Sequence, residues 1–109
     1  MTQYKMCVPH RECLIRELQN DREFAVEYLR EAFVSLDNPQ ERAVSLIAIR
    51  DVAQAYGGLG KIAQEVGISR EALYRALSPK GNPTLNTLLA VLAAVGMRLS
   101  VEPAPSAGA

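Results

Sequence analysis

Apolar residues recur three or four positions apart along most of residues 10–96, the spacing that gives a helix one apolar face. The first such stretch predicts a short helix over residues 10–19. Asp21 can cap a second helix over residues 22–35, because its carboxylate can accept a hydrogen bond from a free backbone N–H of the first turn. The pattern predicts an all-α fold of packed amphipathic helices.

The third predicted helix has a clear start signal. The sequence Asn38-Pro39-Gln40-Glu41 combines an asparagine cap, a proline at the first helical position and a capping-box glutamate. The helix should run to Tyr56, because Gly57-Gly58 permits the positive φ that ends helices. Its apolar positions cover more than half of its circumference, so it is expected to be the most buried helix.

Two shorter helices joined by a tight turn are expected next, over residues 59–66 and 69–77. Gly67 lies where the turn needs a positive φ, and Ala63 is small enough for the two helices to cross closely. Ile68 is expected to anchor the turn in the core. This spacing of alanine, glycine and leucine indicates a helix-turn-helix that reads DNA.

The second of these helices carries the candidate DNA-reading residues. Ser69 can cap it, and Leu73 and Leu77 should face the core. Its outward side chains can read base edges, since arginine binds guanine and glutamate accepts from cytosine; they are Arg70, Glu71, Tyr74 and Arg75. Lys61, Lys80 and Asn82 flank the helix where phosphates could pass. A solvated helix face is the alternative reading of these residue types.

A last helix and a strand complete the pattern. After the cap Thr84, leucines occupy one face and two valines widen it: Leu85, Leu88, Val91, Leu89, Leu92 and Val95. Residues 97–102 alternate apolar and polar, as a half-buried strand does, but no second strand is evident to pair with them. We therefore expect a homodimer, joined through Val91, Val95, Leu99 and Val101.

Length and composition indicate a soluble globular protein of 109 residues. We expect a single domain over residues 1–109, with N-terminal helices over 10–56, the helix-turn-helix core and final helix over 57–96, the strand over 97–102 and a flexible tail over 103–109. No apolar run reaches the roughly 20 residues of a membrane helix, and the N-terminus lacks the apolar segment of a signal peptide. A cytoplasmic protein without a membrane partner is expected.

The charges are unevenly distributed although the formal net charge is zero. Residues 1–56 hold seven Lys/Arg against nine Asp/Glu, whereas residues 57–109 hold five against three. The neutral total argues against a protein that coats nucleic acid without sequence preference, because that binding depends on phosphate neutralisation. The basic half contains the predicted DNA-reading helix.

The chain offers little for catalysis or metal binding. His10 is its one histidine, and no nucleophile and base are evident as a pair. Cys7, His10 and Cys13 have zinc-like spacing but lack a fourth ligand, and the two cysteines are expected to stay reduced. The glycines of residues 57–60 follow a helix rather than a strand, so they do not form a nucleotide-binding loop. No catalytic residue, cofactor or metal is expected.

Three consecutive segments carry a resemblance to a known family: residues 67–77 (GISREALYRAL), 78–83 (SPKGNP) and 84–89 (TLNTLL). They resemble the probable addiction-module antidote family, HigA-like relatives of the lambda-repressor/Cro helix-turn-helix proteins. Residues 23–29 and 97–100 resemble further parts of that family, whereas residues 38–41 replace a shorter acidic turn. The resemblance implies a lambda-repressor-like helix-turn-helix bundle of about five to six helices with a short C-terminal β-strand.

The resemblance also implies a function. Such a protein is the antitoxin of a type II toxin-antitoxin module: it neutralises a RelE/HigB-like toxin, usually one that cleaves mRNA, and as a dimer represses its own promoter. The acidic half, residues 1–56, is expected to bind that basic toxin. Two alternatives stay open, a stand-alone helix-turn-helix regulator without a toxin and an adaptor that binds only proteins.

Overall fold

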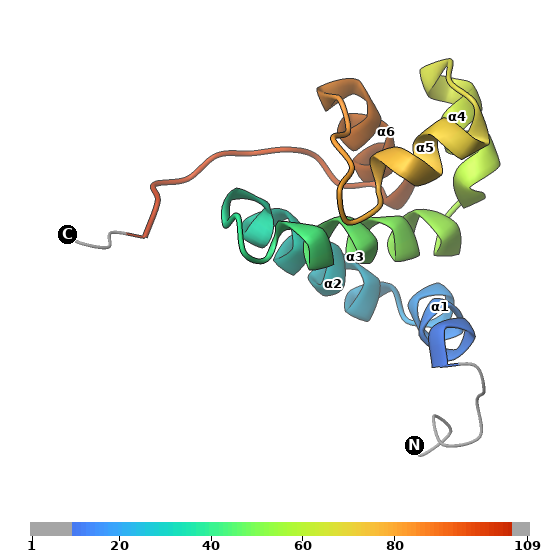
Figure 1. Ribbon diagram of the computed structural model, residues 1–109. Helices are drawn as coiled ribbons and strands as arrows, with labels where there is room; N and C mark the ends of the chain where they lie inside the picture. Colours follow the sequence, from blue (N-terminus) through green and yellow to red (C-terminus); the bar gives the residue numbers. More distant parts are fainter. Residues whose placement is uncertain (1–9, 106–109) are drawn as a thin grey trace.

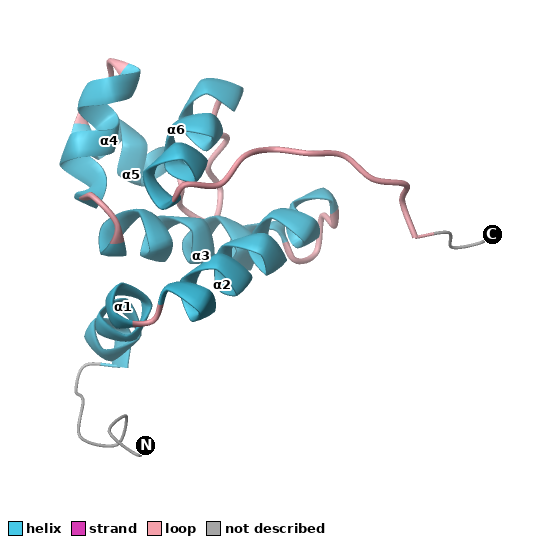
Figure 2. Ribbon diagram, turned by 180° about the vertical axis from the view of Figure 1, so that it is seen from behind, coloured by secondary structure: helices cyan, strands magenta, loops and turns pink. Residues whose placement is uncertain are grey.

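The computed structural model describes residues 10–105, which form six α-helices and one 3-10 helix and no strand (Figures 1 and 2). The predicted all-α class is confirmed. The elements are α1 (His10–Asn20), α2 (Arg22–Val34), η2 (Ser35–Asp37), α3 (Arg42–Ala55), α4 (Gly58–Val66), α5 (Arg70–Ala76) and α6 (Leu85–Val95).

α3 is the central helix of the molecule. α1 and α2 pack on one side of it, and α4 and α6 pack on the other (Figure 1). Its apolar side chains Leu46, Ile49, Val52 and Ala53 are buried, and it has more buried residues than any other helix of the described chain. The prediction that this helix is the most buried is confirmed, and burial on both sides makes α3 a platform on which α4, α5 and α6 are held.

Three predicted helix caps are present. The Asp21 carboxylate accepts from Phe24 N at 3.1 Å, and the Thr84 hydroxyl accepts from Thr87 N at 3.1 Å. The Ser69 hydroxyl accepts from Ala72 N at 3.0 Å. Each cap satisfies a backbone N–H that the first helical turn leaves without a partner.

The predicted start of α3 is wrong by three residues. Asn38 does not cap the helix: its side-chain oxygen accepts from Gln40 N at 2.9 Å, and its carbonyl accepts from Glu41 N at 2.9 Å. These two bonds close a local turn that competes with helix initiation, as asparagine side chains commonly do. α3 therefore begins at Arg42, after Glu41, which makes no side-chain cap bond.

The face that α6 buries differs from the leucine stripe of the sequence. Val91 is 0 % exposed and Val95 is 1 % exposed within a single chain, so the expectation that they lie open for a partner is wrong. Leu85 and Leu89 are exposed instead. The reason is rotation of the helix: Thr87 is buried, and the positions four and eight residues after it, Val91 and Val95, share its face.

The predicted strand over residues 97–102 does not form. Met97 N donates to Leu92 O at 2.8 Å and closes the end of α6, and the residues from Arg98 to Pro105 run away from the helices without regular structure (Figure 2). Leu99 and Val101 are exposed. A strand requires a neighbour for its backbone groups, and the single described chain supplies none.

Two further observations concern a cysteine of α1 and the length of the apolar helices. Cys13 is buried and disulfide-bonded, so the expectation that it stays reduced is wrong. The same expectation was made for Cys7, which lies outside the described residues. No helix in the described part of the chain is both long and apolar enough to cross a membrane.

Candidate nucleic-acid interface

α4 and α5 are joined by a turn that the backbone itself holds. Gly67 adopts φ +85°, and the N–H groups of Gly67 and Ile68 both donate to the carbonyl of Ala63, at 2.8 and 3.0 Å. Ala63 is buried at 2 % exposure, as its small size at the crossing predicted. Ile68 does not anchor the turn in the core as expected, since 37 % of it is exposed. Hydrogen bonds to Ala63 take that role.

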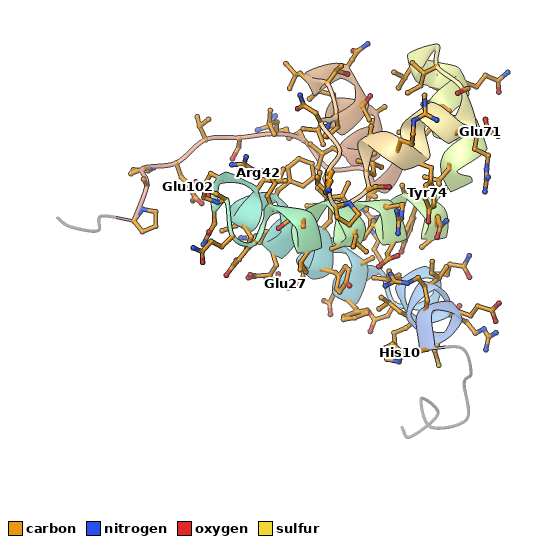
Figure 3. The ribbon with its side chains drawn as sticks, viewed as in Figure 1. His10, Glu27, Arg42, Glu71, Tyr74 and Glu102 are labelled. Carbon is orange, nitrogen blue, oxygen red and sulfur yellow. The ribbon has the colours of Figure 1, made fainter. Side chains whose placement is uncertain are left out.

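α5 is attached through one apolar face and presents the opposite face to solvent. Leu73 and the following Leu77 are fully buried, as predicted. The outward residues named from the sequence are all exposed: Ser69, Arg70, Glu71, Tyr74 and Arg75. In Figure 3, Glu71 lies near the start of α5, whereas Tyr74 lies on the side of α5 that faces α3.

The loop after α5 holds two more of the predicted residues, Lys80 and Asn82, and both are exposed. Between them, Gly81 N donates to Ser78 O at 2.7 Å, and a Cβ at position 81 would lie 2.1 Å from the carbonyl oxygen of Ala76. The loop is therefore pressed against the end of α5, so Lys80 and Asn82 are carried beside that helix by backbone contact.

Lys61 lies apart from this group. It is exposed on α4 and lines a hollow with Tyr56, Ala93 and Ala94, two of which belong to α6. The neighbouring Gly60 lies close to the start of α5, because a Cβ there would be 3.9 Å from Cδ of Arg70. The structure thus brings Arg70 to the start of α4 and leaves Lys61 on the side toward α6.

The basic side chains of this face have no acidic partner among the described residues. Ion pairs join Arg11 to Asp51 and Arg30 to Glu27, and neither includes Arg70, Arg75 or Lys80. Cations that are exposed and unpaired are free to contact phosphates or base edges.

The Arg11–Asp51 pair stabilises the platform behind this face. Asp51 on α3 is 1 % exposed, and one terminal nitrogen of Arg11 donates to both of its carboxylate oxygens, at 2.6 and 2.5 Å. The hydrogen bond to Asp51 raises the pKa of Arg11. Burial, followed by the charge of Asp51, raises the pKa of Tyr28, which lies on α2. The buried carboxylate of Asp51 on α3 is thus paired with Arg11 of α1 and also raises the pKa of Tyr28 on α2.

Sequence reasoning missed Arg50 of α3. Its guanidinium carbon lies 4.2 Å from the centre of the Tyr74 ring, and it donates to the Ser78 hydroxyl at 3.1 Å. The sequence did contain a signal for it: Arg50 lies within a helix predicted to be buried over most of its circumference. A charge in such a helix needs a partner on a neighbouring element.

Comparison with known proteins gives the family. A family model described as "Probable addiction module antidote protein" matches residues 12–103. The chain belongs to this family. A relative from Haemophilus influenzae, described as an uncharacterized protein, is 43 % identical over 65 residues, which are 58 % of this chain and 66 % of the relative. The match thus spans just under two thirds of that relative's length. No solved structure matches the chain.

The antidote-family match extends from α1 past the end of α6, so it includes every residue of α5 and of the loop that follows. The expectation of this family from residues 67–89 is confirmed.

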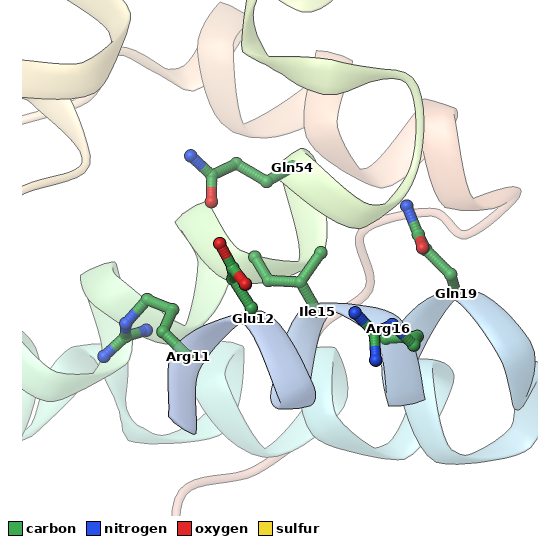
Figure 4. Close-up of a pocket in the computed structure, with 6 residues that line it drawn as sticks. All are labelled: Arg11, Glu12, Ile15, Arg16, Gln19 and Gln54. Carbon is green, nitrogen blue, oxygen red and sulfur yellow. The ribbon is translucent and has the colours of Figure 1, made fainter. Parts of the chain in front are cut away.

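A hollow on another part of this antidote-family chain lies between α1 and α3 (Figure 4). It is lined mainly by long polar side chains: Arg11, Glu12, Ile15, Arg16, Gln19 and Gln54. Within the described residues, no three His, Cys, Asp or Glu side chains gather where they could hold a metal ion.

Proposed function

We propose that this chain is the antitoxin of a type II toxin-antitoxin module, which binds operator DNA as a dimer, represses its own promoter and neutralises a RelE/HigB-like toxin. α4 and α5 act as a lambda-repressor-like helix-turn-helix, and α5 enters the major groove. Arg70, Glu71, Tyr74 and Arg75 read base edges there. Lys80 and Asn82, with Ser69 at the start of α5, contact the backbone of the DNA, and Lys61 binds a phosphate farther along.

The observation that carries the proposal is the unpaired basic face of α5. Arg70 and Arg75 are exposed and lack acidic partners within residues 10–105, and Lys80 follows within a loop that is fixed against the same helix. A short helix with buried leucines on one side and free arginines on the other suits insertion into a groove that an α-helix can enter.

Two kinds of substitution test the DNA-binding role. Arg70→Ala and Arg75→Ala should each lower the preference for the operator by about 1–3 kcal/mol per half-site, since a bidentate contact to guanine is lost. Lys80→Ala should weaken binding to every sequence and reduce the salt slope by about one unit. Fluorescence anisotropy compares DNA from immediately upstream of the gene with a scrambled duplex at several salt concentrations. Unchanged affinity and discrimination in both arginine variants would refute the assignment of α5.

The proposed dimer surface keeps Leu99 and Val101 of the one first expected but uses the outer side of α6 in place of Val91 and Val95. Leu85 and Leu89 on the outer side of α6 are exposed, and so are Leu99 and Val101 in the segment that follows. Apolar side chains gathered on one helix and the extended chain after it favour contact with a second copy. Pairing of residues 97–102 with their copy would also supply the missing neighbour for the strand.

The toxin is proposed to bind the acidic N-terminal half. Glu23, Glu27 and Glu31 are exposed on α2 at four-residue spacing, so they share one helix face. A basic toxin would be attracted to such a stripe. Replacing all three by lysine in the full chain should weaken binding to the product of the adjacent reading frame, with Glu65→Lys on α4 as the matched control. Equal affinity of the triple variant and the control would refute this surface.

The same experiments distinguish the two alternatives, a stand-alone regulator and an adaptor that binds only proteins. A stand-alone regulator would bind the upstream DNA but no product of an adjacent gene. An adaptor would bind a protein partner and would fail to bind DNA even at low salt, where phosphate contacts are strongest.

A further inference from the structure

α5 is a seven-residue helix that packs through one apolar face. Leu73 is its fully buried residue, and the turn at Gly67 fixes its first end through α4. Leu77, which ends the helix, is also fully buried, so α5 is attached along one apolar face. A contact to one side of that face would fix the rotation of the helix about it.

Arg50 makes such a contact beside the apolar face of α5. Its guanidinium stacks on the Tyr74 ring at 4.2 Å and donates to the Ser78 hydroxyl at 3.1 Å. Ser78 in turn donates its hydroxyl proton to the Tyr74 carbonyl at 2.7 Å. A hydroxyl can accept one bond and donate another, so the three residues form a closed set of contacts. These contacts join α3 to both the side chain and the backbone at the end of α5.

The part of α3 that carries Arg50 is tightly packed. Its neighbours on α3, Ile49 and Asp51, are 0 % and 1 % exposed, and Asp51 is held by Arg11 from α1. Arg50 itself is half-buried. Because the backbone of α3 is held in place there, the contacts of the Arg50 side chain can fix the orientation of α5 relative to α3.

We propose that Arg50 is a positioning residue of the DNA-reading helix. By stacking on Tyr74 and bonding Ser78, it fixes the rotation of α5 and thereby sets which base pairs Tyr74 and Arg75 reach. The ligand remains double-stranded operator DNA, and the inference rests on the proposed function. Arginine suits the task because its planar guanidinium can stack on a ring and donate a hydrogen bond at the same time, whereas lysine is a compact point charge.

The first test separates positioning from phosphate contact. Arg50→Met keeps an unbranched side chain but removes the charge, and Arg50→Lys keeps the charge but loses the planar fork. We expect Arg50→Met to reduce the ratio of operator to scrambled-DNA affinity about three- to tenfold, with a smaller loss in Arg50→Lys, while the salt slope stays unchanged. Arg42→Met, on the first turn of the same helix, is the matched control and should leave the ratio unchanged. Equal weakening on both duplexes with a lower salt slope would make Arg50 a phosphate contact and overturn the inference.

A double-mutant cycle tests whether Arg50 acts through Tyr74. In a Tyr74→Leu background, Arg50→Met should cause a smaller loss of operator affinity than in the native chain, because the stacking contact is already gone and only the hydrogen bond to Ser78 is left to break. Additive losses would show that Arg50 acts independently of Tyr74 and would overturn the inference.

NMR of the full chain without DNA completes the test. The Arg50 Nε–H resonance should be displaced by the Tyr74 ring in the native protein and should return toward its ordinary position in Tyr74→Leu and, in part, in Ser78→Ala. An undisplaced resonance would overturn the inference even if DNA binding is specific. If the resonance is displaced but the native protein does not prefer operator over scrambled DNA, the proposed function fails and the positioning role fails with it. If the native protein prefers operator and Arg50→Met keeps that preference in full, only the positioning role fails.

Discussion

Removing Arg11 should destabilise the protein more than removal of any ordinary surface arginine. Asp51 is 1 % exposed, and both of its carboxylate oxygens accept hydrogen bonds from Arg11. Breaking a fully buried ion pair costs about 3–5 kcal/mol, because the remaining charge is left without a partner. The side chain of Arg11 is 52 % exposed, so water can replace part of its contact. We therefore expect Arg11→Met to cost about 2–3 kcal/mol, which is below the range for a fully buried pair.

Urea unfolding followed by circular dichroism measures this cost. Arg30→Met is the matched control, because Arg30 pairs with Glu27 at 3.8 Å and both side chains are more than 60 % exposed. Exposed pairs contribute about 0–1 kcal/mol, so the control should unfold nearly as the native chain does. The double variant Arg11→Met/Asp51→Leu should recover much of the loss, since a packed apolar pair can replace a buried ion pair. A loss in Arg11→Met no greater than in Arg30→Met would refute the reasoning.

Three further predictions concern other parts of the molecule. The raised pKa of Tyr28 means that the unfolded chain loses this proton near the ordinary value of 10.0 while the folded chain retains it. Stability should therefore be complete below that pH and fall as the pH rises from there through the raised pKa of the folded chain, and Tyr28→Phe should lessen the fall in alkaline thermal melts. Gly81→Ala should displace the loop after α5, because its Cβ would lie 2.1 Å from the Ala76 carbonyl oxygen, and should lower both the melting temperature and the affinity for DNA; retention of both would contradict the packing of that loop. Leu89→Glu and Leu99→Glu should each shift the protein from dimer to monomer in light scattering, whereas a native protein that is already monomeric at tens of micromolar would exclude the dimer.

Several elements could be predicted because their signals are local. Asp21, Ser69 and Thr84 each precede a helix and bond a backbone N–H within three residues, so the sequence alone identifies them. The positive φ of Gly67 and the burial of Leu73 and Leu77 follow from the turn and the helical period in the same way. These features, with the segments that carry the family resemblance, were sufficient to predict the exposed face of α5.

Local signals misled where two local structures compete or where a partner is needed. Asn38 has the residue type of a helix cap, yet its side chain bonds Gln40 N and closes a turn instead. Residues 97–102 alternate as a strand does, but a strand forms only when another backbone is beside it. Neither outcome is encoded in the spacing of side chains.

The amino-acid sequence by itself determined the helices, the turn between α4 and α5 and the residues that α5 exposes, because capping and helical periodicity act within a few residues. Tertiary structure decided which side of α6 is buried, with Val91 and Val95 inward and Leu85 and Leu89 outward. It also decided the partners of Arg50 and Arg11, which lie 24 to 40 residues away in the chain. Such pairings depend on how α1, α3 and α5 pack, and the free energy of packing is shared among many side chains at once, so no local stretch of sequence contains it.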